Sequence, residues 1–431
     1  MKYYLAIDIG ASSGRHIVGW QEDGALKTQE VYRFPNGMKG GPHGLVWDTD
    51  EIFSHIKAGI KAAVQQFGAI QSLAIDTWGV DYVLFRGEEI VYPHFAYRNS
   101  RTEQTVPAVH SIIPFEELYS RTGIQFAAFN TIYQLYADKI SGRLEGVTDF
   151  LMVPEYFAYL LTGVKKKEYT MATTTGLVNA QTQAFDGELT SRLGFPDIFP
   201  PLFTAGTAVG PLKEGIAQEV GGQMEVTLSA SHDTACAFEA VECPPDALVL
   251  SSGTWSLLGA KLKEANTGEK SRQCNFTNEG GVGYVRYLKN IMGMWLVNGI
   301  VKKHGISFPE AVSLAEKSSY TQLFDVNDST LSAPEDMEIA VRALLKKNPP
   351  QTLGDVLNSV YHSLANSYRL AAEEIELVLG RKFHSLYIVG GGAKNEYLNR
   401  RTEQYTGKKV IALPIEATAI GNLKSQMQEE G

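Results

Sequence analysis

The chain has 431 residues, of which 44% are hydrophobic and 20% are charged, and its formal net charge is −9 at pH 7. This length exceeds what one hydrophobic core supports, so we expect two domains. The negative charge and the absence of a basic cluster larger than residues 165–167 argue against nucleic acid as a partner. Three cysteines form no disulfide framework and Asp8 interrupts the first apolar run, so we expect a cytoplasmic protein with neither signal peptide nor membrane segment.

The chain begins with a buried-strand pattern at residues 3–7, followed by Asp8, a small polar turn at 10–15 and a second apolar run at 17–20. Backbone N–H groups and hydroxyls in such a turn are open to a phosphate chain. The acid before the turn could hold Mg²⁺, directly or through water. The segment matches neither GxxxxGK[ST] nor GxGxxG, and a plain tight hairpin explains it equally well.

An amphipathic helix is predicted over residues 51–67, and a strand over 72–75 leads into Asp76-Thr77-Trp78-Gly79-Val80-Asp81. Two acids, a tryptophan and a glycine at a strand end are typical of a sugar platform. The aromatic face covers C–H groups there, while carboxylates accept hydrogen bonds from hydroxyls. The alternative is a core tryptophan beside a turn.

The central stretch, residues 229–237 (SASHDTACA), follows a predicted strand at 224–228. Small side chains surround His232 and Asp233 and leave room for a ligand to reach the acid. Asp233 at a strand end is therefore a candidate general base. Taken alone, the stretch is explained better by Asp233 or Ser231 capping the following helix.

The second half of the chain repeats the outline of the first. After a boundary expected at residues 242–245, a strand at 247–250, a polar turn at 251–256 and a strand at 257–260 follow one another. Gly253 holds the place of Gly10. This repetition indicates an internal duplication, in which the two hairpins would face each other across a cleft and clamp one polyphosphate.

The last third contains a long predicted helix, Leu353–Leu379, which ends at Gly380. A strand at 386–389 then leads into Gly390-Gly391-Gly392 and another helix. Glycines at a strand–helix junction let a flat ring lie against the backbone, and the helix N-terminus favours anionic groups. We interpret this junction as an adenosine pocket.

Together these motifs resemble the FGGY family of carbohydrate kinases, and the resemblance runs from residue 5 to about residue 422. Its most specific parts are DIGASSGR (8–15), IDTWGVD (75–81), SHDTA (231–235), LSSGTWSL (250–257), LKNIMG (288–293) and IVGGG (388–392). The resemblance implies an α/β, two-domain actin-like (ribonuclease H-like) ATPase fold with duplicated domains around a cleft. Residues 1–241 would form the sugar-binding and catalytic domain, and residues 242–431 the ATP-binding domain.

The resemblance is strongest to the branch of the family that acts on L-rhamnulose. It implies transfer of the γ-phosphoryl group of ATP to the C1 hydroxyl of that ketose, with Mg²⁺, Asp233 as the base and Asp8 near the metal. The residues implied for the sugar are Trp78, Gly79, His232, Asp233, Thr234 and Asn290. Those implied for ATP are Ala11, Ser12, Ser13, Gly14, Arg15, Thr254, Asn298, Gly391 and Gly392. Gly176 stands where the family's pattern leads us to expect glutamine, and Asn298 where a longer amide is expected.

Two other functions remain open at this stage. One is kinase action on another ketose or a polyol, such as L-fuculose. The other is a non-catalytic, actin-like sensor of nucleotide or sugar. The presence of Asp8 and Asp233 favours the enzyme, and a sensor would more often carry an appended DNA-binding helix pair, which this sequence lacks. A monomer and a homodimer are both compatible with the sequence.

Overall fold

The computed structural model describes residues 1–413 and 416–427, and the chain forms two compact units. Unit 1 consists of Met1–Ala240, Leu262–Arg286 and the described part of Ala417–Gly431. Unit 2 consists of Val241–Lys261 and Tyr287–Glu416. The division differs from two continuous domains at 1–241 and 242–431, because two later segments of the chain return to unit 1.

The main sheet of unit 1 has the strand order β10-β11-β6-β1-β2-β3. Its strands are β1 (Tyr4–Ile9), β2 (Ser13–Glu22), β3 (Ala25–Pro35), β6 (Ser72–Thr77), β10 (Ala208–Pro211) and β11 (Glu225–Thr227). β1 and β2 form an antiparallel hairpin, and β6 runs parallel to β1 on its other side. Asp23 and Gly24, both at positive φ, form the β2–β3 turn, as Asp-Gly pairs commonly do between antiparallel strands.

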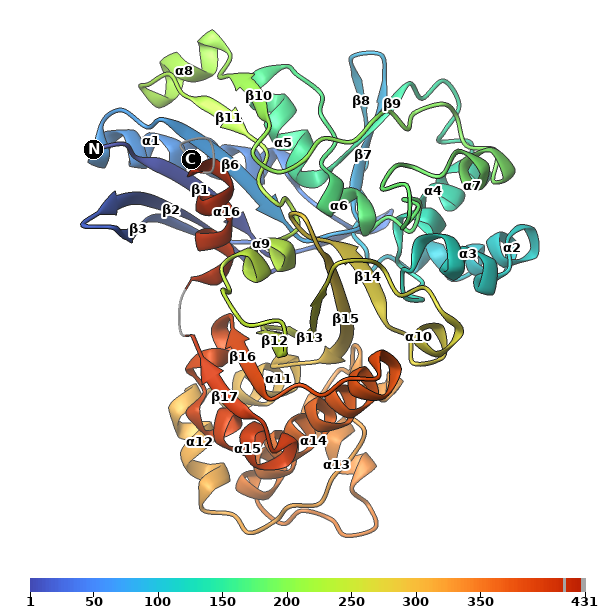
Figure 1. Cartoon of the computed structure of the whole chain (residues 1–431), viewed down its shortest axis with the longest axis vertical. Helices are drawn as coiled ribbons and strands as arrows, with labels where there is room; N and C mark the ends of the chain where they lie inside the picture. Colours follow the sequence, from blue (N-terminus) through green and yellow to red (C-terminus); the bar gives the residue numbers. More distant parts are fainter. Residues whose placement is uncertain (414–415, 428–431) are drawn as a thin grey trace. The chain divides into compact units, whose positions relative to one another are not determined.

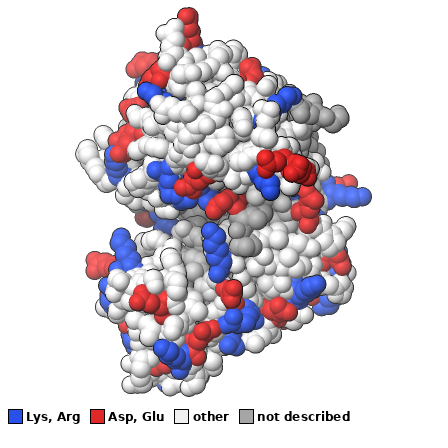
Figure 2. Space-filling view, turned by 90° about the vertical axis from the view of Figure 1, so that its left-hand side faces the viewer, with Lys and Arg blue, Asp and Glu red and all other residues white. Residues whose placement is uncertain are grey.

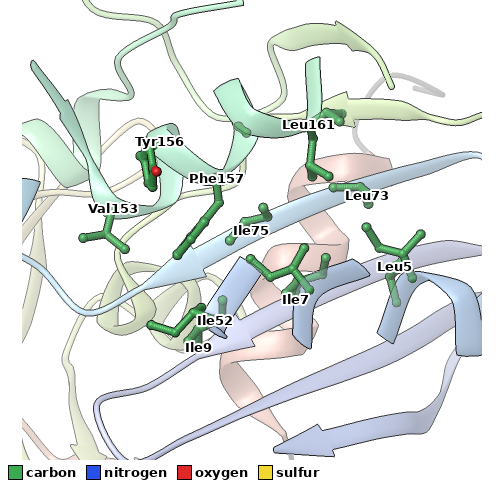
Figure 3. Packing of buried hydrophobic residues seen from close by; sticks show 14 of the residues in the cluster. Leu5, Ile7, Ile9, Ile52, Leu73, Ile75, Val153, Tyr156, Phe157 and Leu161 are labelled. Carbon is green, nitrogen blue, oxygen red and sulfur yellow. The ribbon is translucent and has the colours of Figure 1, made fainter. Parts of the chain in front are cut away.

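One face of this sheet carries the main core of unit 1. Side chains alternate along a strand, so Leu5, Ile7 and Ile9 of β1 point to the same face. They pack with residues of β6 and of helices α1 (Thr49–Phe67) and α5 (Val153–Thr162) in one buried cluster, as Figure 3 shows. Burying one such aliphatic side chain stabilises the fold by about 1.5–3 kcal/mol. α1 starts two residues before the predicted residue 51, at Thr49, where Asp48 caps it by accepting a hydrogen bond from the Glu51 N–H.

The opposite face of the same sheet carries helix α16 (Ala417–Met427), drawn in dark red beside β1 and β6 in Figure 1. Tyr4 and Ala6 of β1 point this way and pack against Ala419 and Leu423 of the helix. By the same alternation, Asp8 follows Ala6 onto this face. The end of the chain therefore covers the side of the sheet on which the first acid of the sequence lies.

The remainder of unit 1 surrounds a smaller sheet of order β8-β7-β9 and a two-stranded β4-β5 ribbon. Its strands are β4 (Lys39–Gly41), β5 (Gly44–Val46), β7 (Tyr82–Arg86), β8 (Glu89–Val91), β9 (Asp149–Met152) and β14 (Thr277–Gly280). Its helices are α2 (Thr105–Ile112), α3 (Phe115–Thr122), α4 (Thr131–Ile140), α6 (Tyr169–Thr173), α7 (Gly187–Arg192), α8 (Glu214–Val220), α9 (Asp233–Glu239) and α10 (Glu269–Gln273).

Unit 2 repeats the strand arrangement of unit 1. Its strands are β12 (Ala247–Ser252), β13 (Trp255–Leu262), β15 (Val285–Met292), β16 (Ser385–Val389) and β17 (Lys409–Ala412). The order β15-β13-β12-β16-β17 matches β3-β2-β1-β6-β11, with an antiparallel hairpin followed by a parallel strand in each case. The structure thus supports the internal duplication expected from the repeated strand–turn–strand pattern.

The helices of unit 2 are α11 (Trp295–His304), α12 (Phe308–Glu316), α13 (Met337–Leu344), α14 (Leu353–Leu379) and α15 (Glu396–Thr406). α14 has the bounds that the sequence predicts. It ends because Gly380 adopts φ +63, a left-handed conformation that few other residues take readily.

The surface carries charges of both signs. Figure 2 shows Lys and Arg side chains interspersed with Asp and Glu on the face that it draws. Within the described residues, no helix has the length and apolar composition that crossing a bilayer requires.

Candidate active site

The polar residues of unit 1 gather where parallel strands end. In the register of β1 and β6, Asp8 lies opposite Asp76. Thr77, at the end of β6, forms a parallel bridge with His232, and its N–H donates to the Ser231 carbonyl at 3.0 Å. The first acid, the strand-end motif and the central stretch therefore meet at one edge of the sheet, where α/β proteins commonly bind ligands.

Asp233 is the first residue of α9, and its side chain is 33% exposed. Its Oδ1 accepts hydrogen bonds from the N–H and hydroxyl of Thr234, at 2.6 and 3.1 Å. Its Oδ2 receives no hydrogen bond from the described part of the chain. The N-cap of α9 is His232, which makes no side-chain cap hydrogen bond, and Ser231 Oγ donates to the Ser229 carbonyl, so neither Asp233 nor Ser231 is the cap that the sequence offered. Asp233 instead bonds its neighbour Thr234 through one oxygen and leaves the other open to a ligand.

His232 is held in place from both sides of its ring. Its Nε2 lies 3.4 Å from Asp233 Oδ1, and its Nδ1 lies 3.2 Å from Glu279 Oε2 and 3.3 Å from Arg286 Nη2. Burial alone would raise the pKa of Glu279, but Arg286 and His232 outweigh it and hold that pKa at about 2. No local pattern in the sequence indicated Glu279, in β14, or Arg286, at the start of β15, both of which lie in the Leu262–Arg286 segment of unit 1.

Asp8 and Asp76 differ in their partners. Arg15, opposite Asp8 in the hairpin register, donates to Asp8 Oδ2 through Nε at 2.8 Å and pairs with it through Nη2 at 2.7 Å. Asp76 is fully buried, and its Oδ2 accepts from Asn422 Nδ2 at 2.6 Å. Burial raises the pKa of Asp76 well above its usual range, and the charges of Asp8 and Asp233 raise it further.

The first hairpin exposes its tip and buries its last glycine. The Gly10 N–H donates to the Ser13 carbonyl at 2.9 Å, while Ser12 is exposed and Ala11 half-buried. A Cβ at Gly14 would lie 2.2 Å from the Phe34 ring. The absence of a side chain at Gly14 is therefore required by packing against Phe34.

The sugar platform expected at the end of β6 takes a different form. Trp78 is 6% exposed and packs on Trp47, with ring centroids 4.0 Å apart, as the core alternative expects. Asp76 and Asp81 are both buried and accept hydrogen bonds from protein N–H groups. The expectation that these two carboxylates receive sugar hydroxyls is wrong, because both are already enclosed by the protein. Gly79 is half-buried beside Thr174.

The residues expected for ATP in unit 2 lie at a matching sheet edge. β12 and β16 are parallel, with Ser251 opposite Val389, so the turns that follow them adjoin. In the first turn Thr254 is exposed, and its carbonyl accepts from the N–H groups of Gly293 and Trp295, both at 3.2 Å, where α11 starts. Asn298 lies one turn into the same helix.

The glycines of the second turn have separate roles. Gly390 adopts φ +83, which favours glycine. A Cβ at Gly392 would lie 2.0 Å from Ser252 Oγ, so this glycine permits close strand packing. Gly391 is exposed, and a Cβ there would meet nothing within 4 Å. Of the two glycines assigned to ATP, only Gly391 presents an open surface.

Asn290, the remaining residue expected for the sugar, belongs to β15 in unit 2. Its Oδ1 is buried and has no hydrogen-bond partner within the described residues. A buried amide oxygen without a partner is uncommon in native proteins and is consistent with a ligand-binding group.

The acids of unit 1 fit a metal that is held mainly by other ligands. Within residues 1–413 and 416–427, no group of three His, Cys, Asp or Glu side chains could hold a metal ion. Asp76 Oδ1 is nevertheless buried without a partner, and the charges of Asp8 and Asp233 act on the same carboxyl. A cation there would offset this repulsion, and Mg²⁺ typically keeps several waters and binds through one or two carboxylates plus phosphate oxygens.

Several solved structures of carbohydrate kinases have this fold. A ligand-bound xylulose kinase from Lactobacillus acidophilus is similar with a TM-score of 0.81, over 99% of this chain and 89% of that one, at 14% identity. A glycerol kinase from Plasmodium falciparum with ADP is similar with a TM-score of 0.78, over 99% and 89%, also at 14% identity. At such low identity these likenesses show the fold alone, and they confirm the two-domain α/β architecture.

Sequence comparison identifies the family as well as the fold. A protein of Oceanobacillus iheyensis named rhamnulokinase is 42% identical over 98% of this chain and 92% of its own length. A rhamnulokinase of Halalkalibacterium halodurans is 41% identical over 100% and 94%. The models for the N- and C-terminal domains of the FGGY family of carbohydrate kinases match residues 3–238 and 248–428. The chain therefore belongs to the FGGY family of carbohydrate kinases, and it is an ATP-dependent sugar kinase.

Proposed function

We propose that this protein transfers the γ-phosphoryl group of ATP to the C1 hydroxyl of L-rhamnulose, giving L-rhamnulose 1-phosphate and ADP. The main support for this substrate is the sequence identity of 42% and 41% to two proteins named rhamnulokinase, over nearly the full length of each chain. The sheet edge of unit 1 supports phosphoryl transfer, since it places the partly exposed carboxylate of Asp233 beside His232, whose ring is held by Glu279.

Asp233 is the general base in this proposal. As the C1 oxygen attacks phosphorus, its proton passes to Asp233 Oδ2, the oxygen that receives no hydrogen bond from the described residues. Such proton transfer contributes roughly 10²–10⁴-fold to the rate. The rest of the rate enhancement comes from positioning and charge stabilisation, which dominate in phosphoryl transfer.

The sugar is held by groups that donate to or accept from its hydroxyls. His232, whose ring is fixed between Asp233 and the Glu279–Arg286 pair, orients one hydroxyl near the base. Asn290 offers its unpartnered Oδ1 to another. The other residues that we assign to the sugar are the Gly79 backbone, Thr234 and an edge of Trp78.

The residues that we assign to ATP form one set in each unit. In unit 1 these are the hairpin residues Ala11, Ser12, Ser13, Gly14 and Arg15, of which Ser12 is the most exposed. In unit 2 they are Thr254, Asn298, Gly391 and Gly392. Asp8, with Asp76 behind it, would hold Mg²⁺ through water, and the bound ion would offset charge on the transferring oxygens. Arg15 keeps the Asp8 carboxylate in place in either case.

A panel of acceptors tests the substrate. We expect kcat/KM for L-rhamnulose to exceed that for L-fuculose, L-ribulose, L-xylulose and glycerol, with ADP release measured in one assay. Loss of the C6 methyl costs about 1–3 kcal/mol, so some ketoses should react slowly. A misplaced hydroxyl should cost more, because it leaves a buried partner unpaired. If kcat/KM is higher for any competitor, the proposed substrate is wrong, although the protein is still a sugar kinase. If none of the acceptors leads to ADP release, a non-catalytic sensor becomes the better interpretation.

Gly391→Val tests the ATP assignment with little structural side effect. Gly391 is exposed, and a Cβ there would meet nothing within 4 Å, so the variant should keep its melting temperature. The new side chain would occupy space that we assign to the nucleotide, and KM for MgATP should rise at least tenfold, equivalent to about 1.4 kcal/mol.

The matched control for this variant is Gly187→Val, because Gly187 also has open space at its Cβ position and lies at the start of α7. It should leave both Michaelis constants unchanged. An unchanged MgATP constant in Gly391→Val, or a rise in the sugar constant alone, would show that the nucleotide does not approach this turn.

We also infer a cytoplasmic enzyme that acts as a monomer or a homodimer. The compartment is supported by its cysteines, since Cys236, Cys243 and Cys274 form no disulfide within the described residues. Light scattering distinguishes the two oligomeric states.

A further inference from the structure

The residue after Gly79 has an unusual backbone. The Asp81 N–H donates to the Gly79 carbonyl at 3.0 Å, which closes a three-residue turn with Val80 at its centre. Val80 adopts φ +69, in the left-handed region. A β-branched residue at positive φ is a genuine outlier, and a γ-turn of this hand is strained. Such strain persists only where the surrounding structure enforces it.

Three side chains from distant segments enforce the conformation of Val80. Its N–H donates to Thr174 Oγ1 at 3.2 Å. Its carbonyl accepts from Thr131 Oγ1 at 2.6 Å and from Gln134 Nε2 at 3.3 Å. Both polar groups of this peptide are thus bonded to side chains, and Gln134 also connects the turn to Asp81.

Asp81 is the centre of this arrangement. Its Oδ2 accepts from Trp47 Nε1 at 2.7 Å, from Trp78 Nε1 at 3.0 Å and from the Tyr97 N–H at 3.1 Å. Its Oδ1 accepts from Gln134 Nε2 at 3.0 Å. The side chain is buried, and burial raises its pKa to about 6, while the hydrogen bonds from Gln134 and the two tryptophans oppose that rise.

Among the described residues, the groups that hydrogen-bond to the Asp81 carboxylate are uncharged N–H donors. Behind Gln134, Arg101 donates to Gln134 Oε1 at 3.2 Å but pairs with Asp138 at 2.6 Å. Asp138 also pairs with Arg143, at 2.9 Å, so two arginines share this one carboxylate, and Arg101 connects to Asp81 through the uncharged Gln134 amide. Buried carboxylates are normally paired with a cation. A buried carboxylate such as Asp81, which is held by neutral donors beside a strained turn, is therefore a candidate for a functional role.

We propose that Asp81 is a positioning residue of the sugar subsite, whose ionised carboxylate holds the strained turn at Val80 and thereby fixes the backbone of Gly79 against the ketose. This role rests on the proposed function insofar as Gly79 lines the sugar. This role explains why an acid, Asp81, stands two positions after Gly79 although the Asp81 side chain is enclosed by the protein. When Asp81 loses its charge, the turn relaxes and the sugar affinity falls, whereas the nucleotide affinity is unaffected.

Asp81→Asn tests this role directly. Whichever way the new amide turns, its NH₂ group opposes an N–H donor, so the turn loses part of its support. KM for the sugar should rise at least tenfold at pH 7.5, while KM for MgATP stays within twofold. Asp186→Asn is the control for replacing a buried acid by its amide away from the site, since Asp186 accepts from backbone N–H groups at the start of α7 and pairs with Arg121. It should leave both constants unchanged.

A second measurement needs no substitution and covers the case in which Asp81→Asn fails to fold. The five tryptophans, labelled with ¹⁵N, give indole N–H resonances, and those of Trp47 and Trp78 report on Asp81 Oδ2. These two should titrate together with a midpoint near pH 6, and Trp47→Phe, which removes one of them, identifies the pair. The sugar KM should rise over the same pH range.

The sign of the stability change separates this effect from denaturation. Because the folded-state pKa of Asp81 is raised, the folded chain binds the proton more tightly than the unfolded chain. The contribution of this group to stability therefore increases as the pH falls through about 6, while sugar affinity decreases. Two indole resonances that do not titrate would overturn the predicted loss of the Asp81 charge near pH 6, and an unchanged sugar KM in Asp81→Asn would overturn the positioning role.

The sugar constants are measured with the best acceptor of the ketose panel. If that acceptor is another ketose, the proposed substrate fails while the same Asp81 effects are still expected. If no acceptor is found, the proposed function and the positioning role fail together, and the indole titration alone decides whether Asp81 holds the turn as a carboxylate.

Discussion

Asp233→Asn is expected to lower kcat by roughly 10²–10⁴-fold while the affinity for ATP stays within twofold of the wild type. The amide has the shape of the carboxylate, and its carbonyl oxygen can still accept the hydrogen bonds from Thr234. It takes no proton from the attacking hydroxyl. The helix start and the fold should therefore survive, so that the loss falls on the chemical step.

Single-turnover kinetics measures the chemical step in this variant, and calorimetry measures ATP binding. Asp186→Asn serves again as a control for replacing a buried, hydrogen-bonded acid by its amide. A kcat within tenfold of the wild type, or a large loss of ATP affinity, would contradict the role of Asp233 as the base.

Gly421→Ala is expected to damage both stability and turnover. Gly421 of α16 packs so closely on α9 that a Cβ would lie 1.8 Å from the Cys236 carbonyl oxygen. A backbone atom cannot rotate away, so the helices must separate, and overpacking of this kind costs about 1–3 kcal/mol. Since α9 begins with Asp233, its displacement should also lower kcat.

Gly215→Ala is the matched control, because the Cβ of residue 215, in the first turn of α8, would meet nothing within 4 Å. It should be neutral or slightly stabilising. Denaturant unfolding and kcat are measured for both variants. A Gly421→Ala protein with wild-type stability and kcat would show that α16 does not position α9.

Local patterns in the sequence predicted the elements best. The apolar spacing of residues 353–379 and Gly380 after them predict α14 with its observed bounds. The strand–turn–strand pattern around Gly10 and Gly253 predicts both hairpins. These features depend on residues close in sequence, and side-chain periodicity and turn chemistry are visible there without knowledge of the fold.

Long-range partners were not predictable in the same way. Asn422 binds Asp76 from 346 positions away, and Gln426 donates to the Leu5 carbonyl from the same helix. Nothing in the composition of residues 417–427 indicates that this helix joins unit 1. For the same reason, the boundary expected at residues 242–245 does not account for Leu262–Arg286, a later segment that belongs to unit 1. This segment places Glu279 and Arg286 beside His232.

The strand-end motif at Asp76–Asp81 was predictable in its position but not in its contacts. Its position at the end of β6 was predictable from the strand pattern. The direction of its carboxylates was not, because Asp81 faces Trp47, Tyr97 and Gln134, which the chain brings together only in the folded state.

The identity of the product tests the central claim most directly. The protein is incubated with MgATP and L-rhamnulose labelled with ¹³C at C1, and the product is analysed by ³¹P and ¹³C NMR. We expect one sugar phosphate whose phosphorus couples to C1, formed in equal amount to ADP. A phosphate on another carbon, or ADP formed without a sugar phosphate, would contradict the proposed reaction.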